Sequence, residues 1–313
     1  MGIIGEAAIF AFVRVWCVLR HPRLLLHFRR RLGQFPDAVT PSTIEEKFLW
    51  RKIFDRNPLF VEASDKLQSK ILARRLEPEL KVAEVLWSGD RPADIPDAAL
   101  QGEVVVKANN GSHMYLFVRN ADVDRAAVER AARRWMVAPY GEGKGEWAYR
   151  HVPRAIVIER MLSEDGLVPP EYKFHVGGGR TSYVYVRADP GTSREREVVL
   201  SRDGIPFALD SANGEPLRDF AVTPRFERLR SIAETLAQPF DFVRCDLYDT
   251  NDGIYFSELT IYPKSGFGTV KNRELAERRN SDWDLRRSWF LTAPQTGWRR
   301  RYAEALRSTL SAQ

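Results

Sequence analysis

The sequence predicts an α+β fold built around antiparallel sheets. Its 313 residues are enough for about two domains. Short apolar runs repeatedly flank turns rich in glycine and asparagine, which is typical of hairpins, and helical segments occur between them at irregular intervals. This irregular order favours antiparallel sheets with helices over a doubly wound parallel sheet.

Composition excludes several classes of protein. Hydrophobic residues make up 44% and charged residues 29% of the chain, as in ordinary globular proteins. The two cysteines, Cys17 and Cys245, are too few and too far apart for a disulfide framework or a metal cluster, and they indicate a reducing compartment. The net charge of +6 is mild, so no nucleic-acid partner is expected.

Residues 1–36 form a basic, apolar segment that carries six arginines and one glutamate. Arg14 and Arg20 interrupt its apolar run, which predicts no spanning helix, and Glu6 before the run does not fit a signal peptide. The pattern predicts an apolar helix with a basic end. Two interpretations follow: the helix packs on the body of the protein, or it lies on an anionic membrane surface.

Periodicity and capping signals give the expected elements in order. A helix begins after Ser42 or Thr43, with Glu45 and Glu46 in its first turn. Ser64 is the expected cap of the next helix. The further expected helices span 64–75, 123–136 and 226–237, and the expected strands span 104–106, 116–118, 155–158, 172–176, 181–187, 243–248 and 254–260.

The last two expected strands form a hairpin. A three-residue loop that ends at Gly253 would close this hairpin and pair Thr250 with Ile254. The same register, followed away from the turn, fixes which side chains of the polar face lie opposite each other.

The polar face of this hairpin carries a candidate metal site. Asp246 would lie opposite Glu258, and Arg244 opposite Thr260, with facing Cβ atoms about 5 Å apart. Two carboxylates this close repel each other unless a cation joins them, and a hard divalent cation with oxygen ligands satisfies both. Arg244 suits a phosphate or an oxyanion. The alternative interpretation is a solvated polar face with an Asp–Arg ion pair.

A second candidate site begins at Lys107, which ends an expected strand. The loop that follows it reads Asn109-Asn110-Gly111-Ser112-His113. It is not a Walker A loop, because no Gly-Lys-Ser/Thr opens a helix. Backbone N–H groups of such a loop can face an anion, and the lysine adds a point charge. The alternative interpretation is a plain hairpin turn beside an exposed lysine.

Taken together, these motifs resemble the ATP-grasp superfamily. The shared order is a lysine on a helix, a lysine before a Gly-Ser loop, an apolar strand that ends in Glu, then Arg-x-Asp and Glu on a hairpin. In this sequence the corresponding residues are Lys66, Lys107, Glu159, Arg244, Asp246 and Glu258.

The closer resemblance is to the TupA-like branch, which includes the teichuronopeptide biosynthesis protein. It rests on Lys-Phe-Leu-Trp-Arg-Lys-Ile-Phe-Asp-Arg-Asn-Pro-Leu at 47–59, Glu-Trp-Ala-Tyr at 146–149, Glu-Tyr-Lys-Phe at 171–174 and Ser-Glu-Leu-Thr-Ile-Tyr-Pro at 257–263. It spans about residues 37–275. The Glu-Leu-Thr-x-Tyr-Pro run is specific in combination with Lys-x-Asn-Asn-Gly-Ser.

The resemblance implies the domain organisation. ATP would lie between two α+β lobes with antiparallel sheets. The basic N-terminal helix would occupy 1–36 and a shortened N-terminal region 37–65. The small lobe with the phosphate loop would occupy 66–162 and the large lobe with the metal hairpin 163–313.

The resemblance also implies the site residues. The nucleotide-binding residues would be Lys66, Lys107, Asn109, Asn110, Gly111, Ser112, His113, Glu159, Arg160, Met161, Leu162, Glu171 and Lys173. Magnesium would be held by Asp246, Glu258 and Thr260, and Arg244 would be the catalytic residue that faces the transferring phosphate.

Within the nucleotide site, the two lysines 66 and 107 would bind the α- and β-phosphates, and the loop 109–113 would close over them. Glu159 would meet the adenine amino group, beside the backbone of 160–162, and Glu171 would take the ribose hydroxyls. Two departures bear on these expectations. Thr260 stands where the superfamily usually has Asn, and only 65 residues precede Lys66.

The chemistry that the resemblance implies is ATP- and Mg²⁺-dependent ligation. ATP would convert a carboxylate into an acyl phosphate, and an amine would displace the phosphate to form an amide or peptide bond. The branch implies a substrate that belongs to a cell-surface polysaccharide or its precursor. It also implies a cytoplasmic location, including the inner face of the membrane.

Three other functions compete with ligation. A phosphotransferase acting on a sugar hydroxyl keeps the same fold, and trapping an acyl phosphate with hydroxylamine would separate the two. A non-catalytic binding module at the membrane conflicts with the retention of both lysines and both carboxylates. A glycosyltransferase fits a polysaccharide setting, but Asp246 and Glu258 do not form an Asp-x-Asp motif.

Overall fold

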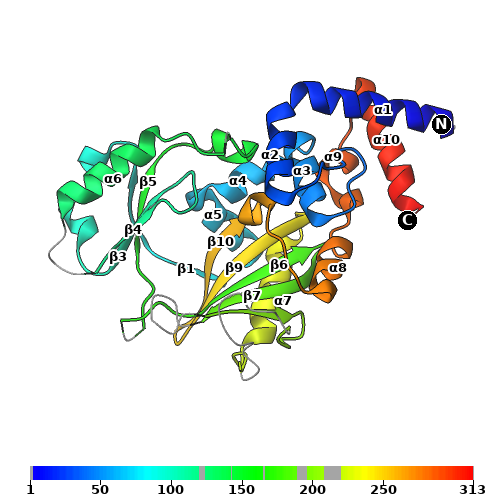
Figure 1. Cartoon of the computed structure of the whole chain (residues 1–313). Helices are drawn as coiled ribbons and strands as arrows, with labels where there is room; N and C mark the ends of the chain where they lie inside the picture. Colours follow the sequence, from blue (N-terminus) through cyan, green and yellow to red (C-terminus); the bar gives the residue numbers. More distant parts are fainter. Residues whose placement is uncertain are drawn as a thin grey trace.

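The computed structural model describes residues 3–119, 124–141, 143–164, 166–188, 196–207 and 220–312. Within them, the chain forms two sheets with helices around both (Figure 1). The larger sheet has six strands in the order β1-β10-β9-β6-β7-β8, and the smaller has four in the order β2-β5-β3-β4. Neighbouring strands are antiparallel apart from β1 and β10, so the predicted α+β fold with antiparallel sheets is confirmed.

The bounds of the elements are as follows. The strands are β1 (Lys81–Val82), β2 (Val85–Gly89), β3 (Val104–Ala108), β4 (Tyr115–Val118), β5 (Ile156–Arg160), β6 (Glu171–Gly177), β7 (Arg180–Ala188), β8 (Arg196–Ser201), β9 (Phe242–Thr250) and β10 (Gly253–Thr260). The α-helices are α1 (Ile3–Arg20), α2 (Pro22–Leu32), α3 (Ile44–Ile53), α4 (Leu59–Ser64), α5 (Lys66–Leu76), α6 (Arg125–Val137), α7 (Phe226–Ala237), α8 (Arg273–Ser281), α9 (Trp289–Thr292) and α10 (Gly297–Ser311). Short 3₁₀ turns are η1 (Pro92–Asp94), η2 (Asp97–Leu100), η3 (Trp147–His151), η4 (Pro263–Gly266) and η5 (Leu285–Arg287).

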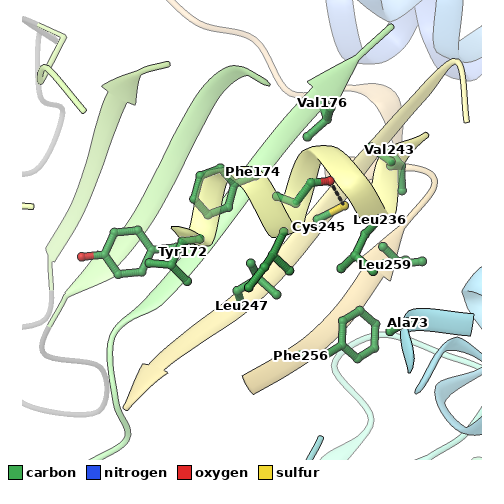
Figure 2. Close-up of a cluster of buried hydrophobic side chains, with 14 of the residues drawn as sticks. Ala73, Tyr172, Phe174, Val176, Leu236, Val243, Cys245, Leu247, Phe256 and Leu259 are labelled. Atoms are coloured by element: carbon green, nitrogen blue, oxygen red, sulfur yellow. Dashed lines mark hydrogen bonds between the residues drawn. The ribbon is translucent and has the colours of Figure 1, made fainter. Parts of the chain in front are cut away.

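One face of the larger sheet packs on α7 and forms an apolar core. Alternate residues of β6 and β9 point into this core, where the Cys245 thiol donates to the Ala233 carbonyl of α7 at 3.5 Å (Figure 2). These core residues include Tyr172, Phe174, Val176, Val243, Cys245 and Leu247. Because side chains alternate along a strand, the residues between them project from the opposite face. That face carries the polar groups predicted for the hairpin.

The smaller sheet packs on α6. The apolar side of α6, with Val128, Ala132 and Trp135, meets the buried residues of β3 and β5. The helix predicted over 123–136 begins at Arg125 and ends at Val137, and residue 123 lies outside the described residues. Asp124 caps it, because its carboxylate accepts a hydrogen bond from a backbone amide in the first turn.

The N-terminal caps of α3 and α5 test two of the predictions made from the sequence. Of the two candidates for α3, Thr43 is the cap, and it forms a capping box with Glu46. The predicted cap Ser64 is wrong: it ends the short α4, and Asp65 caps α5 instead. The Asp65 carboxylate accepts from two backbone amides, which the Ser64 hydroxyl would have satisfied less strongly.

The N-terminal helices pack on the body of the protein. Val13 and Cys17 of α1 and Phe28 of α2 are buried in one cluster with Phe54 and with Tyr302 of α10. One side of this segment is therefore part of the core, as the first of the two interpretations predicts. No helix among the described residues has the length and apolar character needed to cross a membrane.

The hairpin of β9 and β10 differs from the prediction at its turn. Gly253 pairs with Thr250, so only residues 251–252 connect the two strands. The predicted pairing of Thr250 with Ile254 is therefore wrong. Gly253 has a φ of +130°, a conformation that favours glycine and allows this tighter turn.

A bulge restores the predicted register before the strands reach the polar site. Between Phe256 and Glu258, β10 gains one residue relative to β9. Beyond the bulge, Glu258 pairs with Asp246 and Thr260 pairs with Arg244, as predicted.

Candidate active site

Lys66 is the first residue of α5 and lies over the loop that follows β3. Its ammonium group donates to the carbonyls of Gly111 and Asn109. No carboxylate of the described residues forms an ion pair with it. Burial lowers the pKa of Lys66 to about 8, because the charged form is deprived of water. The chain thus holds a buried cation with only neutral hydrogen-bond acceptors.

Two more lysines gather around Glu159, which lies on β5. Lys107 of β3 is 2.8 Å from its Oε2, and Lys70 of α5 is 2.9 Å from its Oε1. Burial pushes the pKa of Glu159 upward, but Lys107 and Lys70 outweigh it and lower the pKa to about 2. We call Lys66, Lys70, Lys107 and Glu159 the lysine cluster.

Lys70 is not among the residues that the sequence predicts for the site. It follows Lys66 by one helical turn, so the two side chains project from the same side of α5. This spacing was the available signal. The Glu159 carboxylate, expected beside an adenine amino group, is ion-paired and only 2% exposed.

The predicted phosphate loop is anchored at its start by Asn109. The Asn109 side chain accepts from the Leu67 amide of α5 at 3.3 Å and donates to the Pro153 carbonyl at 3.1 Å. Asn109 and Asn110 are both buried. These bonds fix the loop to the N-terminus of α5 and to the segment before β5.

The tip of the loop is closely packed at Gly111. A Cβ atom there would lie 2.0 Å from the Met114 side chain, so a larger residue would displace it. Ser112 hydrogen-bonds Tyr140. His113 is exposed and has a φ of +60°, which reverses the chain into β4.

Backbone groups at 160–162 follow β5. The Arg160 amide donates to the Glu84 carbonyl at 2.9 Å, and the Met161 amide donates to the Glu103 carbonyl at 3.0 Å. Within the described chain, Leu162 is therefore the residue of this stretch whose amide has no protein partner. The adenine contact expected at 160–162 stays a prediction, and the Leu162 N–H is the amide of the three that the described chain leaves free to make it.

On the larger sheet, neighbouring strands bring the predicted metal ligands beside two cations. The strands β10, β9 and β6 place three paired residues in one row: Glu258, Asp246 and Lys173. The next row holds Thr260, Arg244 and His175. Both rows project from the face opposite the α7 core.

Arg244 and Lys173 bind the carboxylates of this face. Arg244 forms a two-bond fork to Asp246, at 2.7 and 2.6 Å, and also donates to Glu258 at 2.7 Å. The Lys173 ammonium lies 3.3 Å from Asp246 and 2.7 Å from Glu171. We call Glu171, Lys173, Arg244, Asp246 and Glu258 the carboxylate cluster.

The two facing carboxylates differ in accessibility and pKa. The Asp246 side chain is fully buried, whereas that of Glu258 is 40% exposed. Burial raises the pKa of Asp246 to about 6 despite Arg244 and Lys173. Although burial also opposes ionisation of Glu258, Arg244, Lys173 and Lys66 lower its pKa to about 2. Glu258 is thus the more acidic and the more accessible member of the pair.

Glu171 lies at the edge of this cluster, on β6. Its Oε1 accepts from the Ser257 hydroxyl at 3.0 Å, and its Oε2 pairs with Lys173. Ser257 is the bulged residue of β10, so the bulge brings its hydroxyl toward β6. The expected contact of Glu171 with ribose hydroxyls stays a prediction.

The oxygen donors of this face fit a magnesium ion. Asp246 and Glu258 supply two carboxylates, and the Thr260 hydroxyl lies 3.0 Å from Glu258. No group of three or more His, Cys, Asp or Glu side chains that could hold a metal occurs within the described residues. Two carboxylates suffice for Mg²⁺ bound with a nucleotide, because it keeps waters and takes the remaining ligands from phosphate oxygens.

The lysine cluster and the carboxylate cluster lie within electrostatic reach of each other. The helix α5 packs against β10 and lies between the two sheets in Figure 1. Lys66 and Glu258 each shift the pKa of the other. Cations for phosphate groups and oxygen donors for magnesium are therefore brought together, which is the arrangement that a magnesium–nucleotide complex requires.

The chain belongs to the TupA-like ATP-grasp family, whose model matches residues 46–278. The predicted family and fold class are therefore confirmed, and the chain is placed among the ATP-grasp enzymes. Among curated proteins, none matches it.

Solved structures similar to the chain are ATP-grasp ligases. The PsnB ligase complexed with a minimal precursor is 12% identical, with a TM-score of 0.40 over 80% of this chain and 61% of that one. The D-alanine--D-alanine ligase from Bacillus anthracis complexed with ATP is 12% identical, with a TM-score of 0.40 over 80% and 67%. The macrocyclase MdnC with precursor peptide MdnA, from Microcystis aeruginosa MRC, is 11% identical, with a TM-score of 0.38 over 81% and 63%.

This chain thus spans about two thirds of these ligases or less. The complexes include the two cofactors expected from the sequence, since one holds ATP and a further PsnB complex holds Mg and ADP.

Proposed function

We propose that the protein is an ATP- and Mg²⁺-dependent ligase that joins a carboxylate to an amine. The observation that most supports this is that the packing of α5 on β10 brings the two clusters near each other. Three lysines with one carboxylate lie within reach of an ionised glutamate on the metal face. Such an arrangement binds a polyphosphate on one side and its magnesium on the other.

Each cluster has a distinct task in this proposal. Lys66 and Lys107 neutralise the α- and β-phosphates, and the loop 109–113 covers them. Asp246 and Glu258, with Thr260, would hold magnesium, which draws charge from the phosphate oxygens as the γ-phosphate is transferred. Arg244 orients both carboxylates and presents its guanidinium to the transferring phosphate.

The reaction proceeds in two transfers. A carboxylate oxygen of the substrate attacks the γ-phosphorus, and the bond from this phosphorus to ADP breaks. The amine nitrogen then attacks the acyl carbon, phosphate leaves, and the nitrogen gives up a proton. Positioning and charge compensation account for catalysis, since no side chain forms a covalent bond.

The proposed substrate belongs to a cell-surface polysaccharide or its precursor, which is what the sequence resemblance to the TupA-like branch implies. A glycan-linked substrate would bring the enzyme to the inner face of the membrane. Amino acids and uronic-acid sugars are accordingly the first compounds to test.

The proposal is tested by supplying MgATP, hydroxylamine and a panel of these carboxylates, with products identified by mass spectrometry. Formation of an acyl hydroxamate, lost in Glu258→Gln, is the expected result. Formation of a phosphorylated sugar without any hydroxamate would indicate a phosphotransferase instead of a ligase. ATP turnover that no carboxylate stimulates would refute the ligase assignment.

A further inference from the structure

The helix α1 is apolar on both sides, but the described chain covers only one of them. Val13 and Cys17 are buried against the body. On the opposite side an exposed stripe runs along the helix: Ala8, Ala11, Phe12, Val15, Val18 and Leu19. We call this stripe the outer face of α1. Its larger side chains are strongly exposed, with 60% of Val15 and 73% of Leu19 accessible.

The outer face continues onto the start of α10. The ring of Trp298 lies 5.7 Å from that of Phe12 and 4.9 Å from that of Trp16. Figure 1 shows α1 at the periphery of the molecule, with α10 beside it. The exposed stripe, with the partly buried Trp298 beside it, is an apolar patch of the kind that marks an interaction site, since a helix that is apolar on all sides is normally covered.

Exposed arginines follow the outer face along the chain, at the end of α1 and on α2. Five of them follow its C-terminal end, are exposed, and form no ion pair with an acidic residue of the described chain: Arg20, Arg23, Arg29, Arg30 and Arg31. Beside Trp298, the Arg299 guanidinium stacks over the indole at 5.2 Å.

Two acids on neighbouring elements form ion pairs with arginines. Asp37 pairs with Arg14 at 3.0 Å, and Glu304 lies 3.8 Å from Arg300. An apolar patch on α1 is therefore followed, along α2, by exposed arginines without acidic partners among the described residues. This charge pattern complements an anionic surface rather than a second copy of the same patch, whose arginines would repel it.

We infer that the outer face of α1 docks on an anionic lipid surface. The apolar stripe and Trp298 enter the boundary between headgroups and acyl chains, and the arginines meet the anionic headgroups. Each basic residue near such a surface strengthens binding about fivefold. Attachment is peripheral, and it is independent of the ligase activity proposed above.

Point substitutions test this inference better than truncation, because the inner side of the segment 1–36 is part of the core. Flotation of the full chain would be compared on vesicles of phosphatidylcholine alone and with phosphatidylglycerol. We expect binding only to the anionic vesicles. The double variant Val15→Ser/Leu19→Ser should bind at least about tenfold more weakly, and Arg30→Gln/Arg31→Gln about 25-fold.

The matched control is Ile71→Ser/Val137→Ser, which removes two aliphatic side chains that are equally exposed elsewhere, at 57% and 74%. It should leave vesicle binding unchanged. Thermal unfolding checks that each variant folds, and the single change Leu19→Gln replaces the double variant if it does not. Wild-type binding should weaken as salt rises, since screening acts over about 8 Å at physiological ionic strength.

Three results would overturn the inference. These are no binding by the wild type, equal binding to neutral and anionic vesicles, and stripe variants that bind like the wild type. Light scattering provides a fourth: if the wild type is a dimer that Val15→Ser/Leu19→Ser converts into a monomer, the outer face binds a second copy instead.

Discussion

The lysine cluster and the carboxylate cluster are both buried groups of charges, yet they compensate charge in opposite ways. In the lysine cluster, Lys70 and Lys107 share the single carboxylate of Glu159, and the third ammonium group, that of Lys66, donates to backbone carbonyls. In the carboxylate cluster, three carboxylates share two cations that bind them directly. The first cluster is left positive and the second is close to balanced.

The pKa shifts of the cations follow this difference. Burial lowers the pKa of Lys66 and of Lys70, whereas Asp246 and its neighbours raise the pKa of Lys173 and of Arg244 despite burial. Folding thus opposes the charge of the first two cations and supports that of the second two. The lysine cluster thus has positive charge that the described chain does not compensate and that an anionic ligand could compensate. The carboxylate cluster is held together by the chain itself.

The largest expected effect concerns stability. Asp246→Ala removes the carboxylate that Arg244 and Lys173 share, and should lower the free energy of unfolding by about 3 kcal/mol, because Arg244 loses its two-bond fork and Lys173 loses one of its two carboxylates. Lys66→Met should leave that free energy unchanged or slightly higher, because it removes a cation whose charge burial disfavours. Urea denaturation measures both. Equal losses in the two variants would contradict the comparison.

The next effect concerns turnover. Glu258→Gln keeps the shape of the accessible metal ligand but removes its charge, and should lower Mg²⁺-dependent ATP turnover about 100-fold or more. Because Glu258 is 40% exposed, this variant should fold normally. Asp252→Asn, at the tip of the same hairpin, is the matched control and should turn over ATP like the wild type. If Glu258→Gln turns over ATP at a near-normal rate, the assignment of a metal site to this hairpin is wrong.

The hairpin also shows how far sequence could predict the site. Alternating apolar residues such as Cys245 and Leu247 identify the buried face, so the polar face followed from the two-residue period alone. The turn was predicted one residue too long. A bulge at Ser257 compensates for that error, so the site register came out as predicted. A bulge is set by local hydrogen bonding between strands, which a residue pattern does not encode.

Contacts between distant elements were less predictable. Lys70 reaches Glu159 only because α5 packs beside β5, and Lys173 reaches Asp246 only because β6 pairs with β9. Neither adjacency follows from the spacing of these residues in the chain.

The N-terminal segment illustrates a third case. Two interpretations were open because α1 is apolar on both sides, and only the fold shows which side the protein itself covers.

A third prediction compares one lysine from each cluster. Lys107→Ala should weaken binding of a non-hydrolysable ATP analogue about 10- to 100-fold, the loss expected for a hydrogen bond to a charged group. Lys173→Ala should weaken it less, because two carboxylates bind the Lys173 ammonium, whereas Lys107 shares the single carboxylate of Glu159 with Lys70. Calorimetry decides the order. If Lys107→Ala binds the analogue as tightly as the wild type, the lysine cluster does not hold the phosphates.

The smallest expected effect is a pH dependence that arises in the lysine cluster. Lys66, which faces Glu258, Lys107, Glu159 and Lys70, has a pKa of about 8 in the free protein. Phosphates favour its charged form, so affinity for the ATP analogue should be full below pH 8 and fall as pH rises above it. The loss between pH 7 and 9 is up to about tenfold if the bound pKa lies above 9. Lys66→Arg keeps its charge over this range, so its affinity should change less with pH, whatever its absolute value. Calorimetry at pH 7, 8 and 9 compares the two slopes. Identical slopes would show that another group titrates. The charge of Lys66 would then not contribute to nucleotide binding.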